Sequence, residues 1–278
     1  MDAALKNSLL KTATKVRIGI IESIHSAKAG HPGGSLSCAD ILTYLYFAHM
    51  NIDPQNPQKA DRDRLVLSKG HAAPALYSVL AHRGFFSTDL LLTLRKQGSI
   101  LQGHPDMKHI PGVDMSSGSL GQGVSCAVGM ALSAKHFCNN YKVYAILGDG
   151  EIEEGQVWEA AMFAANKGLS NLTAFVDYNG LQIDGSIEEV NSAAPIDKKF
   201  EAFNWHTIVI DGHDFDQIEA ALKEAETVDK PVAIIAKTVK GKGVSYMENA
   251  VNWHGAAPND ELAAQAVAEL KEALAKLG

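Results

Sequence analysis

Two stretches, VYAILGDG at residues 143–150 and LTAFVDYNG at residues 172–180, decide the fold. Each is a continuous apolar run that ends in Gly, Asp or Asn, which is typical of a strand buried on both faces of a parallel sheet. The helical pattern at Glu154–Asn166 lies between them and provides a crossover. The two strands are therefore expected to be neighbours, with their carboxyl ends at one edge of the sheet.

The same alternation of strands and helices extends over the rest of the chain. Further strands are predicted at Arg64–Ser68, Thr207–Ile210 and Val232–Ala236. Helices are predicted at about 5–20, 38–49, 120–137, 154–166, 215–226 and 261–277, with one more directly after His71, and Asp214 is a good N-cap with Gln217 three residues on. No repeat or linker interrupts the pattern. We expect one α/β domain over residues 1–278, with a mainly parallel sheet and helices on both faces.

Composition limits the classes of partner. The net charge of −7 argues against nucleic acid as a main partner, but not against a small phosphorylated ligand. No apolar run has the length of a membrane span, and the N-terminus lacks the layout of a signal peptide. Cys38, Cys126 and Cys138 show no CxxC spacing, and the last two are expected to be buried thiols. We expect a soluble, cytoplasmic protein.

The strand ends carry the ligands expected for a metal ion. Adjacent parallel strands would place the Asp149 carboxylate beside the Asn179 amide oxygen, and both are hard oxygen ligands suited to Mg²⁺. Gly150 has no Cβ, so a diphosphate can approach the backbone N–H groups there. Gly-Asp-Gly alone would more often be an ordinary turn. Its pairing with a second polar strand end favours a magnesium–diphosphate site.

Four histidines stand next to glycines in expected loops: His31, His71, His104 and His254. Imidazole can donate to phosphate and exchange protons near neutral pH. A solvated surface histidine is the alternative for any one of them. Zinc is a weaker alternative for the group, since no HxxxH or HxxEH spacing occurs. The remaining histidines lack this context and are expected to be structural or solvated: His25, His49, His82, His109, His136, His206 and His213.

Two further loops could bind an anion. Ser116–Gly123 is a Gly/Ser loop that opens a helix, where unpaired N–H groups are available. It superficially resembles a dinucleotide fingerprint, but no clear strand precedes it and Cys126 stands where the third glycine or alanine belongs. The basic segment KTVKGKG at 237–243 follows a strand. It could close over a phosphate or be solvated surface, and the sequence leaves both open.

The ordered set of motifs resembles the N-terminal domain of transketolase over roughly residues 10 to 258. The matching motifs are GHPGGSLSCADIL, DRLVLSKGH, GHPD, SSGSLGQG, GDGEIEEGQVWEA, VDYNGLQIDG, KTVKGKG and WHGAAP. The resemblance implies a thiamine-diphosphate-binding fold and, with it, thiamine diphosphate and Mg²⁺ as cofactors. Ser119, Glu151 and Tyr178 depart from the residues expected at those positions, and none of these departures removes a proposed metal ligand.

The resemblance also implies roles for individual residues. The implied Mg²⁺ ligands are Asp149, Asn179 and the backbone carbonyl of Leu181. The implied cofactor contacts are Gly150, His71 and His254 on the diphosphate side, and Gly118 and Leu120 beside the aminopyrimidine. The histidines implied to face the sugar and the reacting carbon are His31, His71, His104 and His254. Glu154 resembles the family's acid at the cofactor-linked dimer contact.

The implied reaction transfers a two-carbon ketol (glycolaldehyde) unit from a ketose phosphate to an aldose phosphate. In full-length transketolases a second domain supplies the glutamate that activates the aminopyrimidine, and this chain does not contain that domain. The expectation is therefore the N-terminal subunit of a split transketolase, active only with a C-terminal partner subunit, in an α₂β₂ assembly. The alternatives are a specialised-sugar transketolase, a deoxyxylulose-phosphate-synthase-like enzyme and a non-catalytic scaffold. A nicotinamide dehydrogenase is disfavoured, because no clear strand precedes the Gly/Ser loop at Ser116–Gly123.

Overall fold

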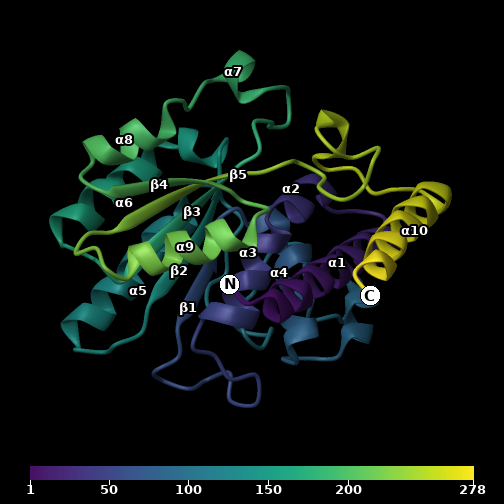
Figure 1. Ribbon diagram of the computed structural model, residues 1–278, viewed down its shortest axis with the longest axis horizontal. Coiled ribbons are helices and arrows are strands. Elements are labelled where there is room, and N and C mark those ends of the chain that lie inside the picture. Colours follow the sequence, from purple (N-terminus) through teal and green to yellow (C-terminus); the bar gives the residue numbers. More distant parts are fainter.

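Five parallel strands form the centre of the computed structural model, which describes residues 1–278 (Figure 1). They are β1 (Arg64–Leu67), β2 (Val143–Gly148), β3 (Leu172–Tyr178), β4 (His206–Asp211) and β5 (Val232–Lys237). Their order in the sheet is β1-β2-β3-β5-β4. All five predicted strands are confirmed, with ends that differ by one or two residues.

The register brings the carboxyl ends of the strands to one edge. β2 pairs with β3, and Gly148 lies opposite Asp177. β5 pairs with β3 on its other side, where Ala236 lies opposite Asp177. The residues directly after β2, β3 and β5 therefore emerge together, at the edge where open α/β sheets bind their ligands.

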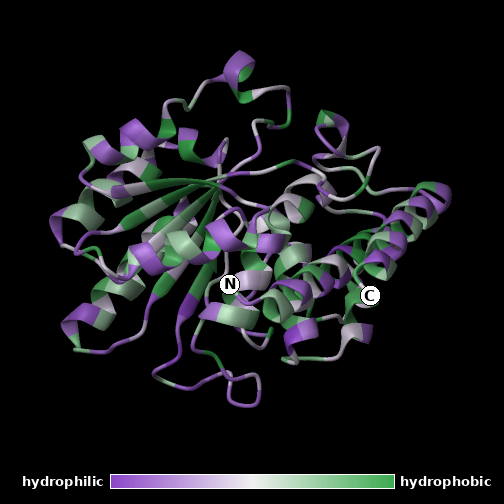
Figure 2. Cartoon of the chain, viewed as in Figure 1, coloured by the Kyte–Doolittle hydropathy of each residue, from purple (hydrophilic) through white to green (hydrophobic).

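Both faces of the sheet are buried, which explains the continuous apolar runs. Alternate residues of a strand point to opposite faces, so Leu65 and Leu67 belong to one hydrophobic core while Val66 belongs to the other. Every residue of β2 is buried. The strands accordingly form the most hydrophobic part of the ribbon in Figure 2.

Helices cover both faces, as predicted. On one face lie α5 (Gln122–His136), α6 (Gly155–Asn166) and α8 (Ile196–Ala202). On the other lie α1 (Ala3–Ala27), α3 (Ala39–Tyr44), α4 (Ala73–Arg83) and α9 (Phe215–Ala225), and α10 (Asp260–Lys276) packs along α1 (Figure 1). The short elements are α2 (Pro32–Ser37), α7 (Ile187–Val190), the π-helical η1 (Leu45–His49) and the 3₁₀ turns η2 (Gly70–Ala72), η3 (Thr88–Thr93), η4 (Glu151–Glu153) and η5 (Val251–Trp253). Asp214 is the N-cap of α9, as predicted, and accepts a hydrogen bond from the N–H of Asp216.

Two local predictions are wrong. The motif AGHPGG at residues 29–34 predicts a turn, but α2 begins within it, because Pro32 suits a first helical position. Gly33 serves close packing there, since a Cβ would lie 2.9 Å from the carbonyl oxygen of Trp253. Cys138 is exposed and Cys126 half-buried, contrary to the expected burial. Cys138 lies beyond the end of α5, in a left-handed conformation (φ 55°), where the chain leaves the core.

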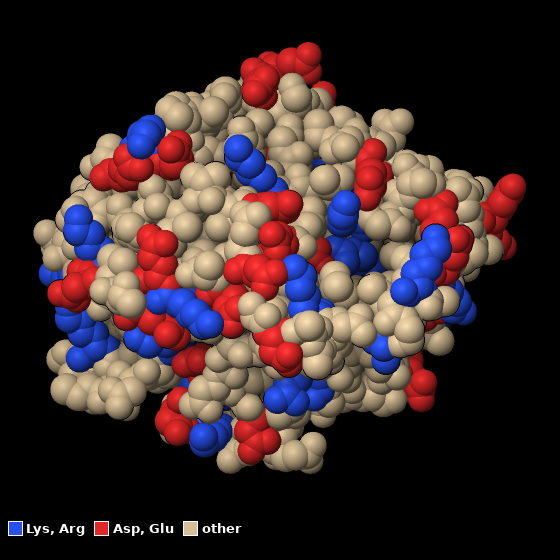
Figure 3. Space-filling model, viewed as in Figure 1, with Lys and Arg blue, Asp and Glu red and all other residues tan.

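No helix of the chain is both long and apolar enough to cross a lipid bilayer. On the face shown in Figure 3, acidic and basic side chains are interspersed, and the basic ones do not form a continuous surface.

Candidate active site

Asp149 and Asn179 lie together at the carboxyl edge of the sheet, as the sequence predicted. The Asp149 side chain is buried, with 3% of the residue exposed. Its Oδ1 accepts a hydrogen bond from the N–H of Gly150 at 2.9 Å, and its Oδ2 accepts one from the N–H of Gly180 at 2.6 Å. Asn179 Oδ1 accepts from the N–H of Leu181 at 3.2 Å. The ends of β2 and β3 are therefore joined through the Asp149 carboxylate.

A cavity of about 250 Å³ opens above these strand ends. It is lined by most of the residues that the sequence singled out: His31, His71, Gly118, Leu120, Asp149, Gly150, Asn179, Leu181 and His254. These residues come from six separate segments of the chain, and the carboxyl edge of the sheet brings them together. The other lining residues are Gly34, Lys69, Gly148, Glu151, Gln182, Ile183 and Lys240.

Three of the four predicted histidines form a triangle on the cavity wall. The ring centroids of His31 and His71 are 5.2 Å apart, those of His31 and His254 5.5 Å, and those of His71 and His254 5.4 Å. Burial lowers the pKa of all three, and for His254 burial and the Lys240 charge lower it to about 4. Each ring is therefore neutral near pH 7 and has both a donor and an acceptor nitrogen. The buried Nδ1 of His31 has no hydrogen-bond partner.

His104 and Glu154 do not line the cavity. The His104 ring packs against Gly118, where a Cβ would lie 3.1 Å from it. The positive φ of Gly118 (153°) and its lack of a side chain allow this close approach. Glu154 is exposed at the start of α6, beside Gly121. The structure thus places these two side chains around the loop at 118–121 and not on the cavity wall.

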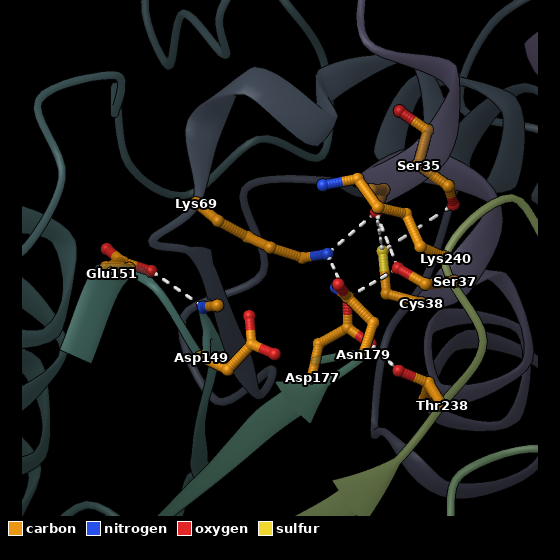
Figure 4. Close-up of polar contacts among 12 residues, drawn as sticks. Ser35, Ser37, Cys38, Lys69, Asp149, Glu151, Asp177, Asn179, Thr238 and Lys240 are labelled. Carbon is orange, nitrogen blue, oxygen red and sulfur yellow. Dashed lines mark hydrogen bonds and ion pairs between the residues drawn. The ribbon is translucent and has the colours of Figure 1, made fainter. Parts of the chain in front are cut away.

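A buried ion pair that the sequence did not reveal lies beneath the cavity (Figure 4). The ammonium group of Lys69 contacts the Asp177 carboxylate and donates to the carbonyl of Gly34 at 2.7 Å. Asp177 also accepts from Ser37 at 2.5 Å and from Thr238. Burial opposes the ionised form of Asp177, but the Lys69 charge and these donors outweigh it and hold its pKa below the ordinary value. One carboxylate therefore ties together the segments at 37, 69 and 238.

Within the basic segment at 237–243, Lys240 does not fit the solvated-surface alternative, whereas Lys237 is exposed. Only 1% of Lys240 is exposed, so it is not part of a solvated surface. Its ammonium group donates to the carbonyl of Leu181 at 3.0 Å and lies 2.8 Å from Nδ1 of His254. Burial lowers its pKa to about 8, although the Asp149 charge acts in the opposite direction. The only sequence signal for this lysine was its position before a glycine in a loop that follows a strand. Lys69 precedes Gly70 in the same way.

Glu151 is a further residue whose role the sequence did not show. It is buried and accepts three hydrogen bonds, from Ser68 Oγ at 2.6 Å, from the N–H of Gly121 at 2.9 Å and from the N–H of Gly148 at 3.0 Å. Burial raises its pKa, and the three donors act against that rise. Glu151 therefore holds the turn after β2 against the loop that precedes α5.

The chain matches known proteins over nearly its whole length. Residues 9–276 match the thiamine diphosphate binding domain of transketolase. The chain is 48% identical to the 6-deoxy-6-sulfo-D-fructose transketolase subunit SqwG of Clostridium sp. (strain MSTE9), over 94% of this chain and 95% of that protein. It is 43% identical to one of the subunits of the apulose-4-phosphate transketolase of Phocaeicola vulgatus, over 95% of this chain and 94% of that protein.

Single-chain transketolases match only in part. Human transketolase is 42% identical over 97% of this chain, which corresponds to 43% of the human protein. The crystal structure of Campylobacter jejuni transketolase superposes with a TM-score of 0.90 and 32% identity, over 100% of this chain and 46% of that one. The chain therefore belongs to the transketolase family, in which it corresponds to the thiamine-diphosphate-binding domain.

Proposed function

We propose that the cavity binds the diphosphate of thiamine diphosphate through Mg²⁺, with Asp149, Asn179 and the carbonyl of Leu181 as the protein ligands. The observation that carries this proposal is the joining of the β2 and β3 ends at one cavity wall. All three proposed ligands are oxygen atoms, which is the donor set that Mg²⁺ prefers. Burial and the nearby Asp177 charge raise the pKa of Asp149 to about 7 against the effect of its N–H donors and Lys69, so a bound cation would favour the ionised carboxylate further.

The same wall suits a diphosphate. Lys240 places a cation at the cavity, and His71 and His254 add neutral donors. A Cβ at Gly150 would lie 3.3 Å from Gln182, which also lines the cavity, so glycine at this position leaves more room for a ligand. The unpartnered Nδ1 of His31 is a free hydrogen-bonding atom for a ligand. Gly118 and Leu120 are proposed to lie beside the aminopyrimidine, and residues 1–278 to act as one cofactor-binding domain.

The reaction in this proposal is transfer of a two-carbon ketol unit from a ketose phosphate to an aldose phosphate. When bound, thiamine diphosphate supplies the nucleophilic carbon. The histidines of this chain bind sugar hydroxyls and move protons at the reacting carbons, and neutral imidazoles can do both. The exposed His104, whose ring packs against Gly118, is included among these histidines.

A partner subunit completes the proposed enzyme. The chain spans 43% of human transketolase but 95% and 94% of the two relatives named as subunits. The proposed partner is a C-terminal transketolase subunit, which joins this chain in an α₂β₂ assembly in the cytoplasm, with Glu154 at the contact between cofactor sites. The exposed position of Glu154 at the start of α6 is compatible with such a contact.

A specialised sugar is the second candidate for the substrate. It is favoured by the names of two relatives, which refer to 6-deoxy-6-sulfo-D-fructose and to apulose 4-phosphate. A panel of phosphorylated and sulfonated ketoses, assayed with the partner subunit, separates this candidate from an ordinary ketose phosphate donor.

The metal assignment is tested with Asp149→Ala. Thiamine diphosphate affinity is measured by calorimetry with Mg²⁺ and the partner subunit present, and a large loss is expected. Asp184→Ala is the matched control, because it removes an exposed carboxylate in the same loop region. Equal affinities of Asp149→Ala and the control would contradict the ligand assignment. Turnover by the purified chain without any partner would contradict the split-subunit proposal.

A further inference from the structure

We propose that His213 is a positioning residue that fixes the loop carrying Thr238 and Lys240 by accepting a hydrogen bond from the backbone N–H of Val239. The inference rests on the proposed function, because Lys240 lies in the proposed diphosphate site. The sequence pattern gave His213 no role, and it does not line the cavity.

A buried series of contacts connects α1 to His213. Both guanidinium nitrogens Nη1 and Nη2 of Arg17 bind the Asp40 carboxylate, at 3.0 and 2.6 Å. Asp40 Oδ2 also lies 2.7 Å from Nδ1 of His213. The side chains of Arg17, Asp40 and His213 are only 9%, 6% and 14% exposed. Although burial opposes ionisation of Asp40, the Arg17 charge and the His213 contact lower its pKa to about 2, so it is an ionised acceptor.

The hydrogen bonds of His213 determine which of its ring nitrogens carries the proton. The N–H of Val239 donates to Nε2 of His213 at 2.9 Å. A nitrogen that accepts a hydrogen bond has no proton of its own, so the proton lies on Nδ1 and is donated to Asp40. Arg17 and Asp40 thus hold His213 in the neutral tautomer whose Nε2 can accept from the loop. The hydrogen bond at Nδ1 thus fixes the protonation of Nε2 and the orientation of the ring, as in other histidines that have a carboxylate partner.

The loop held in this way reaches the cavity from both sides of Val239. Thr238 binds Asp177 beneath the cavity, and Lys240 lies against Leu181 and His254 on its wall. The turn at Gly212 packs directly on this loop, since a Cβ on Gly212 would lie 2.5 Å from the Thr238 methyl group. The turn after β4 is therefore the support on which the residues after β5 are placed.

Two substitutions separate the two bonds of His213. In His213→Gln the side-chain oxygen can occupy the position of Nε2 and accept from Val239, whereas the bond to Asp40 is lost. In His213→Asn the amide nitrogen can occupy the position of Nδ1 and donate to Asp40, but the side chain is too short to reach Val239. If His213 served only the ion pair, Asn would be the better replacement. If it positions the loop, Gln is the better one.

The direct readout is amide hydrogen exchange at Val239 in the full chain. His213→Asn is expected to speed that exchange on the order of tenfold, while His213→Gln stays close to wild type. The control is His206→Asn, at the start of β4, which removes a histidine–carboxylate pair with Glu224 far from the loop and leaves Val239 exchange unchanged. Thermal unfolding confirms that each variant is folded. Unchanged exchange in folded His213→Asn, or faster exchange in Gln than in Asn, would overturn the inference.

The functional readout is the affinity for thiamine diphosphate, measured with Mg²⁺ and the partner subunit. His213→Asn should raise the dissociation constant on the order of tenfold, and His213→Gln should restore it. Loss of binding in Asp149→Ala together with unchanged binding in His213→Asn would refute only the positioning role. No binding by the wild-type protein would refute the proposed function, and the exchange at Val239 would still decide whether His213 holds the loop.

Discussion

Replacing Lys69 with methionine should lower the free energy of unfolding more than replacing an exposed lysine does. Methionine keeps most of the volume but leaves the Asp177 carboxylate buried without a cation, with only Ser37, Thr238 and Asn179 as hydrogen-bond donors. Removing one partner of a buried pair costs about 3–5 kcal/mol. For 278 residues, an unfolding entropy of about 2.1 cal/mol/K per residue gives about 0.6 kcal/mol/K, so Tm should fall by about 5–8 °C.

The assay is thermal and urea unfolding of the wild type, Lys69→Met, Asp177→Asn and the double variant. The double variant replaces both charges by neutral groups, so it should recover part of the stability that Lys69→Met loses. Lys198→Met is the control, because Lys198 pairs with Glu201 on the surface and its loss should leave Tm unchanged. The reasoning is refuted if Lys69→Met unfolds at the wild-type temperature, or if the double variant is no more stable than Lys69→Met.

Three more predictions concern the supports of the site. In a urea titration, Gly70→Ala should destabilise the protein by about 1–3 kcal/mol, because its Cβ would lie 2.7 Å from the backbone nitrogen of Gly118. The control is Gly129→Ala in α5, which should not destabilise the protein, because no atom would lie within 4 Å of its Cβ. Glu151→Gln should cost about 1–3 kcal/mol in that titration, because its NH₂ group would face one of the N–H donors that the carboxylate now accepts from, and an unchanged midpoint would contradict this account. Asp40 has a folded pKa of about 2 against an ordinary value of 3.8, so its contribution of about 2 kcal/mol to the free energy of unfolding is complete above pH 3.8 and is lost as the pH falls towards 2. The stability difference between wild type and Asp40→Asn should therefore shrink over that pH range. A constant difference would contradict the assignment.

The strands and the strand-end residues could be predicted because their signals are local. A buried parallel strand needs a continuous apolar run, and β2 and β3 show one that ends in Gly, Asp or Asn. Parallel pairing then brings Asp149 and Asn179 to one edge without further information. Three of the four glycine-flanked histidines also converge on the cavity, but only His71 comes just after a strand end, so strand pairing does not explain the positions of His31 and His254.

The buried charges could not be predicted because their causes are distant in the sequence. A lysine before a glycine in a loop is normally solvated, and only the Asp177 carboxylate, 108 positions away, explains why Lys69 is buried. His213 had no local signal either, since its partners Asp40 and Val239 come from α3 and from the loop after β5. Cys138 shows the opposite error, in which an apolar helix pattern was extended past the last helical residue.

The way Asp177 is saturated with partners has a consequence for how relatives of this protein can diverge. Ser37 and Thr238 each donate to one oxygen of the carboxylate without lining the cavity, so these two bonds do not depend on what enters it from solvent. Changes at the rim, such as at the exposed Ile183, leave this foundation intact. Relatives of this protein can therefore differ in the outer loops of the cavity and still keep the contacts of Asp177 beneath it.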